Sequence, residues 1–314
     1  MSFSGKVKDE LSRQTSVARH CQISELTAII SMCGRISVSV KDSFMVKIHT
    51  ENIAVARKCF TLLKKTFNIN TEISIRQNSA VKNTIMYSVI VKDNEQAKRV
   101  LEATKLLNKY NQIEENLSIA NNVIIMQECC KRAFIRGAFL ASGSISDPRK
   151  YYHFEIVCTT MDKARQLQEI IKFFEIDAKI VERKKYFVVY IKEGSGIVDI
   201  LNVMEAHVSL MELENVRILK EMRNTVNRKV NCETANLKKT VSASVKQIED
   251  ITYIRDTIGL SGLSEGLEEV ANLRLNNPDA SLKELGSMLN PPVGKSGVNH
   301  RLRKICKIAD GLRN

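Results

Sequence analysis

The sequence predicts an α+β fold, in which a duplicated unit of helices and strands is followed by an all-α helix-turn-helix domain. Three observations support this prediction. The segment 20–36 returns 109 positions later as the segment 129–145. Segments of β-branched residues alternate with helical patterns in both copies. Near the end of the chain, a short helix, a Pro/Gly turn and a basic helix follow one another.

The repeated segment carries cysteine, glycine and isoleucine at matching positions. The matched pairs are Cys21 and Cys130, Gly34 and Gly143, and Ile36 and Ile145. A small residue also recurs in the middle of the segment, where Ala28 corresponds to Gly137. Matches continue beyond the segment with a slowly decreasing offset, as loop deletions between duplicated units would produce. A period of about one hundred residues indicates a domain duplication, because solenoid repeats are shorter.

Each copy is predicted to contain a helix, two strands, a helix, two strands and a final helix. In the first copy, β-branched segments predict strands at 35–40, 43–50, 71–77 and 85–92. Apolar residues at helical spacing predict helices at 52–67 and 94–108. In the second copy, the run 187–191 is typical of a buried strand. We expect the two copies to occupy residues 1–110 and 111–222.

The repeated segments resemble the helix motif of LAGLIDADG homing endonucleases. That resemblance implies a saddle made of two sheets, with the two motif helices packed side by side. Small residues would let the helices approach closely, because the separation of packed helices follows the size of the contacting side chains. These residues are Ala28, Gly137, Ala138 and Ala141. The simpler alternative is that they only fill the core.

The repeated segments lack the aspartates that bind the catalytic metal in these endonucleases. In the endonucleases the motif ends in Asp-Gly, and the aspartate holds a divalent metal; here Cys33 and Ser142 precede the glycines. Phosphodiester cleavage with Mg²⁺ requires hard oxygen ligands, whereas a thiol is soft and a hydroxyl is neutral. Glu25 lies about two turns before Cys33, and Asp147 precedes a proline and favours a turn. We therefore expect no catalytic residue, no bound metal and no cofactor.

Charge favours a polyanionic partner. The chain has 314 residues, a formal net charge of +13 and a pI of about 9.3, which is typical of nucleic-acid-binding proteins. A basic protein that binds no polyanion is the alternative.

The sequence contains no apolar run of membrane-spanning length, and the N-terminus lacks the apolar region of a signal peptide. We expect a cytoplasmic, nucleoid-associated protein.

The 8 cysteines show no obvious ligand pattern. The sequence contains no C-x-x-C pair and no Cys/His spacing typical of a zinc site. We expect these cysteines to be small apolar side chains in the core.

Helical and polar segments alternate in the last third of the chain. A helical run at 197–223 precedes a polar, Asn-rich stretch at 223–240, which we interpret as a linker. The helix-turn-helix domain is expected at 241–314, with helices at 241–258, 264–276, 282–289 and 296–307. Ser281 and Glu284 form a capping box at the start of the short helix. Gly259 lies where a helix C-cap glycine belongs.

The last helix has the residues that reading of the DNA major groove requires. Polar side chains opposite its apolar face are the candidate base contacts: Ser296, Asn299, His300 and Arg303. Neighbouring cations are the candidate phosphate contacts: Lys283, Lys295, Arg301, Lys304 and Lys307. The alternative is a solvated charged helix on a structural bundle.

Basic residues in the predicted sheets form a second candidate for phosphate contacts. They are Arg76, Lys82, Arg183, Lys184 and Lys185. The same side chains are equally consistent with solvated hairpin charges.

The combination of an inactivated LAGLIDADG-like duplication with a C-terminal helix-turn-helix resembles the WhiA family of Gram-positive bacteria. The segments that carry this resemblance are RGAFLASGS at 136–144, VNCETAN at 230–236, NPDAS at 277–281 and NPPVGKSGVNHRL at 290–302. The resemblance implies a non-enzymatic, sequence-specific DNA-binding protein that regulates transcription. It also implies a part in cell division and chromosome segregation, and in sporulation in some relatives.

Two other functions remain open from the sequence. One is a metal-dependent endonuclease that recruits its metal through other carboxylates. The other is a cell-division scaffold that acts mainly through protein contacts. The expected partner is double-stranded DNA, with a protein co-regulator on the LAGLIDADG-like domain as a further possibility and no membrane partner.

Overall fold

The computed structural model describes residues 2–38, 43–78, 84–107 and 120–313. Contacts divide the chain into two compact units, residues 1–220 and 221–314. The predicted α+β architecture with a helical C-terminal domain is confirmed. Lys82, one of the candidate phosphate contacts, lies outside the described residues.

The first unit contains the predicted duplication, preceded by α1 (Phe3–Arg13). The first copy consists of α2 (Arg19–Cys33), β1 (Gly34–Val38), β2 (Phe44–Thr50), α3 (Ile53–Phe67), β3 (Glu72–Asn78), β4 (Thr84–Val91) and α4 (Asn94–Ala103). The second copy consists of α5 (Glu128–Ser142), β5 (Gly143–Ile145), β6 (Phe154–Cys158), α6 (Met161–Lys172), β7 (Lys179–Arg183), β8 (Tyr186–Ile191) and α7 (Gly194–Val203). Both copies follow the predicted order of helices and strands.

The two sheets have the same topology. Their strand orders are β1-β2-β4-β3 and β5-β6-β8-β7, and every neighbouring pair is antiparallel. Equivalent residues occupy equivalent registers, since Ile48 pairs with Val89 and Ile156 pairs with Val189. Alternate residues of β2 are buried, as expected for a strand with one face on the core. The duplication therefore preserves side-chain placement as well as element order.

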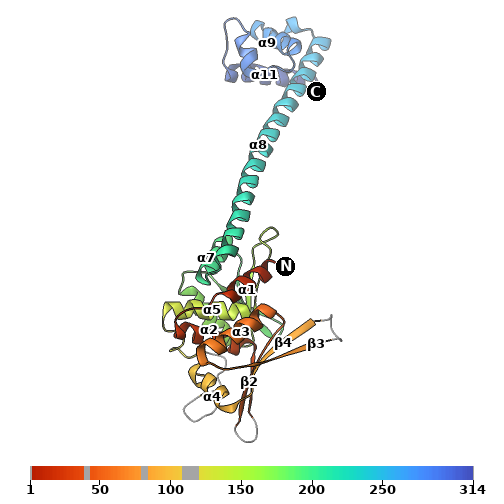
Figure 1. Ribbon diagram of the computed structural model, residues 1–314. Helices are drawn as coiled ribbons and strands as arrows, with labels where there is room; N and C mark the ends of the chain where they lie inside the picture. Colours follow the sequence, from red (N-terminus) through yellow and green to blue (C-terminus); the bar gives the residue numbers. More distant parts are fainter. Residues whose placement is uncertain (1, 39–42, 79–83, 108–119, 314) are drawn as a thin grey trace. The chain divides into compact units, whose positions relative to one another are not determined.

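The motif helices α2 and α5 lie side by side at the centre of the first unit (Figure 1). A Cβ atom added to Gly137 would lie 2.3 Å from the Glu25 carbonyl oxygen and 3.0 Å from the Ala28 Cβ. No real side chain tolerates a backbone oxygen at 2.3 Å, so only glycine fits at this crossing. The small residues at Ala28 and Gly137 thus permit the close approach that the sequence suggested.

A buried group of charged side chains stabilises the packing of α2 against α5. Glu25 is fully buried, and its Oε1 lies 3.0 Å from Lys58 Nζ and 3.2 Å from Arg136 Nε. Arg136 Nη1 reaches Glu205 Oε2 at 2.6 Å, and its Nη2 donates to the Ser16 hydroxyl. Removing one member would leave an uncompensated buried charge, which is strongly destabilising. Glu25 is therefore a structural carboxylate that links α2, α3 and α5.

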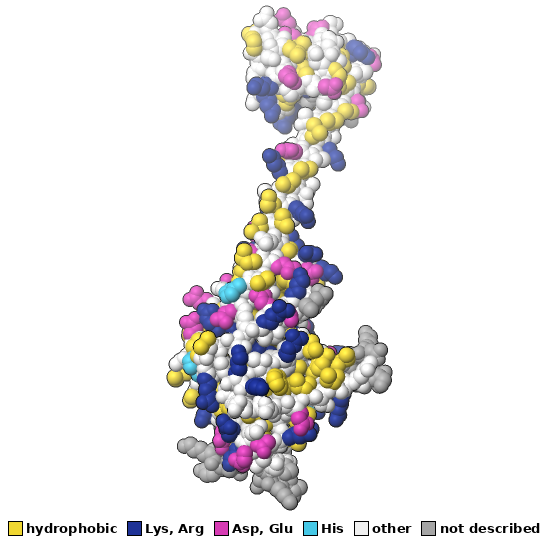
Figure 2. All heavy atoms as spheres, in the orientation of Figure 1, with side chains coloured by type: hydrophobic (Ala, Val, Ile, Leu, Met, Phe, Trp, Pro, Cys, Tyr) yellow, Lys and Arg dark blue, Asp and Glu magenta, His cyan; other side chains and the backbone are white. Residues whose placement is uncertain are grey.

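The helix α8 (His207–Thr257) corrects the prediction for the segment before the second unit. The predicted run 197–223 divides into α7 and the start of α8, and the stretch 223–240, which we interpreted as a linker, is helical. Residues 221–243 are all exposed, and Figure 2 shows both basic and hydrophobic side chains along this part of α8. The segment 207–257 contains no proline or glycine, so nothing in it terminates a helix.

The second unit packs around a small core of its own. It contains the end of α8, a 3₁₀ turn (Leu260–Gly262), α9 (Glu265–Asn276), α10 (Leu282–Ser287) and α11 (Lys295–Arg313). Gly259 ends α8 with a φ of 74°, a conformation that favours glycine. Among the helices of the described ranges, none combines the length and hydropathy of a membrane span.

The crossing of α2 and α5 generates a stability prediction. We expect Gly137→Ala to lower the free energy of unfolding of the first unit by about 1–3 kcal/mol, because the added methyl meets backbone rather than a movable side chain. Gly194→Ala is the matched control in the same unit, since its Cβ would make ordinary contact with Tyr152 at 3.7 Å. Its change should stay within roughly 0.5 kcal/mol. Chemical denaturation of both variants measures the difference; equal stabilities would contradict the assigned packing.

Candidate nucleic-acid interface

The capping box at the start of α10 forms as predicted. The Glu284 backbone N–H donates to Ser281 Oγ at 3.3 Å, and the Ser281 backbone N–H donates to Glu284 Oε2 at 2.7 Å. These two bonds satisfy donors that a helix start leaves free. Hydrogen bonds from the backbone and the side chain of Ser281 to the Glu284 carboxylate lower the pKa of that carboxyl below its usual range. Helix α10 therefore begins at a defined residue.

The turn between α10 and α11 is held close to α10. The Val293 backbone N–H donates to the Gly286 carbonyl oxygen at 2.9 Å. A Cβ atom on Gly286 would lie 2.0 Å from the Val293 carbonyl oxygen, so this position also requires glycine. The geometry sets where α11 begins relative to α10, which is what a helix-turn-helix must fix before its second helix can enter a groove.

One face of α11 is buried in the second unit. Val298, Leu302 and Ile305 have no exposed surface, as the sequence pattern predicted. They pack with apolar residues of α8, α9 and α10, including Ile254, Val270 and Leu285. Helix α11 runs to Arg313, about one and a half turns beyond the predicted end at Lys307. A buried inner face fixes the rotation of α11 about its axis and so decides which residues face outward.

The candidate base contacts occupy the remaining surface of α11. Ser296, His300 and Arg303 are exposed. Asn299 is half-buried and borders a hollow of about 680 Å³, which Lys283 and Lys295 also line. All four lie in the first half of the helix, the part from which recognition helices reach base edges. Their role in binding is not tested by the geometry and stays a prediction.

The candidate phosphate contacts divide into two groups. Lys283, Lys295, Lys304 and Lys307 are exposed, and none of them forms an ion pair with another residue that the structure describes. Arg301 differs because its Nη1 donates to the Gly266 carbonyl oxygen at 3.3 Å. That bond ties α11 to the start of α9 and makes Arg301 a weaker candidate for phosphate than the four lysines.

The degenerate motif positions lie at the C-terminal ends of α2 and α5. Cys33 Sγ donates to the Ile29 carbonyl oxygen at 3.3 Å, and Ser142 Oγ donates to the Ala138 carbonyl oxygen at 3.4 Å. Both side chains thus turn back onto their own helix. Burial raises the pKa of the Cys33 thiol to about 12, so it is neutral at physiological pH. Neither position supplies an anionic oxygen for Mg²⁺.

A cation from α1 approaches the same place. Lys8 lies near Cys33, and its Nζ is 5.8 Å from the centre of the Phe139 ring. Burial lowers the pKa of Lys8 below its usual value. A lysine at this point opposes the binding of a divalent cation. Glu25 does not compensate, because Lys58 and Arg136 already engage it.

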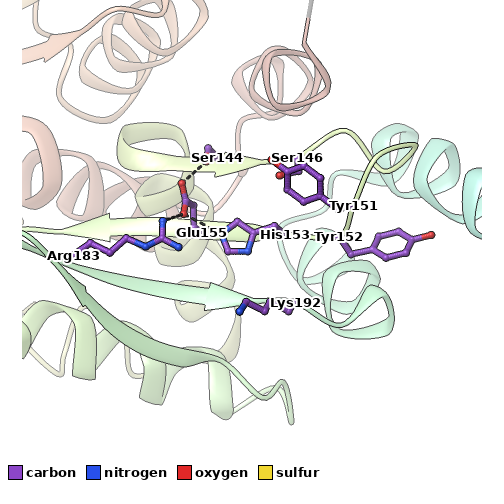
Figure 3. Close-up of a pocket in the computed structure, with 8 residues that line it drawn as sticks. All are labelled: Ser144, Ser146, Tyr151, Tyr152, His153, Glu155, Arg183 and Lys192. Carbon is purple, nitrogen blue, oxygen red and sulfur yellow. Dashed lines mark hydrogen bonds and ion pairs between the residues drawn. The ribbon is translucent and has the colours of Figure 1, made fainter.

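The sheet of the second copy carries a shallow pocket of about 520 Å³ (Figure 3). Glu155 lies at its centre and accepts hydrogen bonds from Ser144, His153 and Arg183 at 3.0–3.1 Å. Burial alone would raise the pKa of Glu155, but the bonds from His153 and Ser144 and the charge of Arg183 lower it. Arg183 therefore pairs with Glu155 through Nη1, while about half of its side chain is exposed, at 53%.

The other sheet cations are exposed. Arg76 lies on β3, Lys184 occupies the β7–β8 turn with a φ of 57°, and Lys185 follows it. Their positions are equally compatible with phosphate contact and with solvation, so the saddle remains a secondary candidate.

The cysteines only partly match the expectation of core side chains. Cys21, Cys59, Cys130 and Cys158 are buried, whereas Cys129 and Cys232 are exposed and Cys33 and Cys306 are half-buried. The expectation was therefore wrong for the exposed pair. The exposed thiol of Cys129 therefore does not serve as a core side chain.

Three family models match successive parts of the chain. They describe the WhiA N-terminal LAGLIDADG-like domain at residues 19–107, the WhiA LAGLIDADG-like domain at 131–223 and the WhiA C-terminal HTH domain at 226–309. These matches coincide with the first copy, the second copy and the helical unit that the structure shows.

Relatives match over the whole length. The chain is 58% identical over 313 residues to the "Probable cell division protein WhiA" of Lachnoclostridium phytofermentans, covering 100% of both chains. It is 49% identical to the protein of the same name from Alkaliphilus oremlandii, covering 100% of this chain and 98% of the relative. The crystal structure of full-length DUF199/WhiA from Thermatoga maritima is similar with a TM-score of 0.60 and 27% identity, covering 99% and 98% of the two chains.

Proposed function

The chain belongs to the WhiA family, and from that premise we propose that it is a non-enzymatic, sequence-specific DNA-binding regulator of transcription. The main support for this proposal is the arrangement of the two faces of α11. Its inner face is locked into the core of the second unit, while its outer face presents Ser296, Asn299, His300 and Arg303. Arg pairs with guanine and Asn with adenine in the major groove, so this face has the chemistry of direct readout.

The exposed lysines supply the sequence-independent part of the binding. Lys283 and Lys295 lie near the start of α11, and Lys304 and Lys307 follow along it. Contacts of this kind to phosphates set affinity and salt dependence, and they position the helix without choosing a sequence. We propose accordingly that the protein associates with the nucleoid.

The cellular role follows from the relatives. The relatives at 58% and 49% identity are named as cell division proteins, and we propose a role in cell division for this chain. A link to chromosome segregation belongs to the same proposal. The LAGLIDADG-like unit would act as a scaffold, either by binding a protein co-regulator or by adding phosphate contacts from the saddle.

Substitutions on α11 separate base reading from phosphate binding. On a duplex selected by the wild-type protein from a random pool, Arg303→Ala should cost about 1–3 kcal/mol and relax the preference at one base pair. Lys307→Ala should weaken binding to selected and unrelated duplexes alike and reduce the slope of log affinity against log salt by about 1. Fluorescence anisotropy over a range of salt concentrations measures both effects.

Arg255→Ala is the matched control, because Arg255 is an exposed cation of the same unit that pairs with Asp256 outside α11. It should leave affinity and salt slope unchanged. If Arg303→Ala weakened selected and unrelated duplexes equally, Arg303 would be a phosphate contact and the assigned readout would be wrong.

The absence of metal ligands at Cys33 and Ser142 generates a prediction about cleavage. Purified full-length protein should leave supercoiled plasmid intact in Mg²⁺ or Mn²⁺, because Cys33 and Ser142 place a neutral thiol and a hydroxyl where a carboxylate would be needed to hold the metal. Gel analysis of plasmid nicking measures this directly. Metal-dependent nicking that follows the protein through successive purification steps would support the nuclease function instead.

A further inference from the structure

Four potential metal ligands converge at the N-terminal ends of α2 and α5. They are His20 and Cys21 from α2, and Cys129 and Cys130 from α5. Their ligand atoms all lie within 4.8 Å of one another. This group, the Cys₃His cluster, lies at the opposite ends of the two helices from Cys33 and Ser142, and so it is separate from the degenerate motif site.

The distances within the Cys₃His cluster approach those of a metal site. His20 Nδ1 lies 3.2 Å from Cys130 Sγ, 3.3 Å from Cys21 Sγ and 4.0 Å from Cys129 Sγ. A tetrahedral zinc ion with bonds of about 2.0–2.3 Å holds its sulfur and nitrogen donors about 3.5–3.8 Å apart. Shifts of a few tenths of an ångström for these three pairs would produce that geometry.

We propose that the Cys₃His cluster binds one zinc ion. Three cysteine sulfurs and one imidazole nitrogen form one of the standard donor sets of structural zinc sites. Soft sulfur ligands favour zinc over magnesium or calcium, which prefer oxygen. Four protein ligands also leave no open position for substrate, so the ion would serve a structural role.

The surroundings make the Cys₃His cluster accessible and well held. Cys21 and Cys130 are buried, while His20 and Cys129 are exposed, so an ion can enter from solvent onto a buried pair of sulfurs. One turn further along α2, Ser24 Oγ donates to the Cys130 carbonyl oxygen at 2.8 Å. This bond fixes the separation of the two helices next to the ligands.

The internal repeat gives the Cys₃His cluster an approximate symmetry. The same 109-residue offset that matches Cys21 to Cys130 also matches His20 to Cys129. Each copy therefore contributes an adjacent pair of ligands from the first turn of its motif helix. A zinc ion held by both pairs would cross-link the two copies of the duplication.

A redox pair is the main alternative for clustered thiols. A disulfide would join only two of the three sulfurs and would give His20 no part, although His20 Nδ1 lies 3.2–4.0 Å from all three sulfurs. The convergence of all four side chains therefore fits a metal site better than a thiol pair.

Metal content tests the proposal. Full-length protein purified under reducing conditions without chelator should contain one zinc per chain by native mass spectrometry and elemental analysis. Replacement by Co²⁺ should produce the sulfur-to-cobalt charge-transfer and intense d–d absorption of a tetrahedral thiolate site. Cys129→Ala and His20→Ala change exposed side chains, so both variants should fold while losing most of the bound metal.

Cys232→Ala is the matched control, since Cys232 is an exposed thiol on α8 outside the cluster. It should retain the zinc. A chelator should lower the Tm of the wild type and of Cys232→Ala but not that of Cys129→Ala, because an ion that binds only the folded state stabilises it. The proposal is overturned by wild-type protein that takes up neither zinc nor Co²⁺, or by Cys129→Ala and His20→Ala variants that keep the metal. Either result leaves DNA binding by α11 unaffected.

Discussion

The close packing of α2 against α5 is the constraint on which the first unit depends. Gly137 removes the Cβ that would collide with the Glu25 backbone, and the Glu25 side chain joins Arg136 and Lys58 in a fully buried ion group. Two sheets of identical topology then extend from the C-terminal ends of these helices. Because one helix comes from each copy, the contact that closes the core also joins the two halves of the duplication.

The same helix pair shows how the duplicated architecture packs without an aspartate at either motif helix end. Its C-terminal ends carry a neutral thiol at Cys33 and a hydroxyl at Ser142, and the Lys8 ammonium lies beside Cys33. The packing of α2 against α5 needs no carboxylate at Cys33 or Ser142. In the proposed function, α11 of the second unit recognises DNA, since it has a buried face for positioning and a polar face for contact.

Sequence patterns were most informative where local signals agree with tertiary packing. The strands, the capping box at Ser281 and the inner face of α11 all followed from periodicity and from turn residues. The composition of the predicted linker 223–240 did not reveal its helical conformation, because a polar, Asn-rich composition reflects exposure, and exposure does not end a helix that lacks proline and glycine. The hydrogen bond from Arg301 to Gly266 joins residues on different helices, which no local pattern reveals.

The Cys₃His cluster does not match the sequence spacing of known zinc motifs, because its ligands are two adjacent pairs that lie 109 residues apart. The internal repeat was the signal in the sequence that could have indicated it.

The central claim is that the outer face of α11 reads DNA sequence in the cell. Genome-wide crosslinking of the tagged protein, compared with an Asn299→Ala/Arg303→Ala double variant, tests this claim most directly. The account predicts sharp peaks that share a sequence motif in the wild type and are lost in the double variant at equal protein abundance. Broad coverage that is insensitive to the two substitutions would contradict the account, because binding would then arise from net positive charge alone.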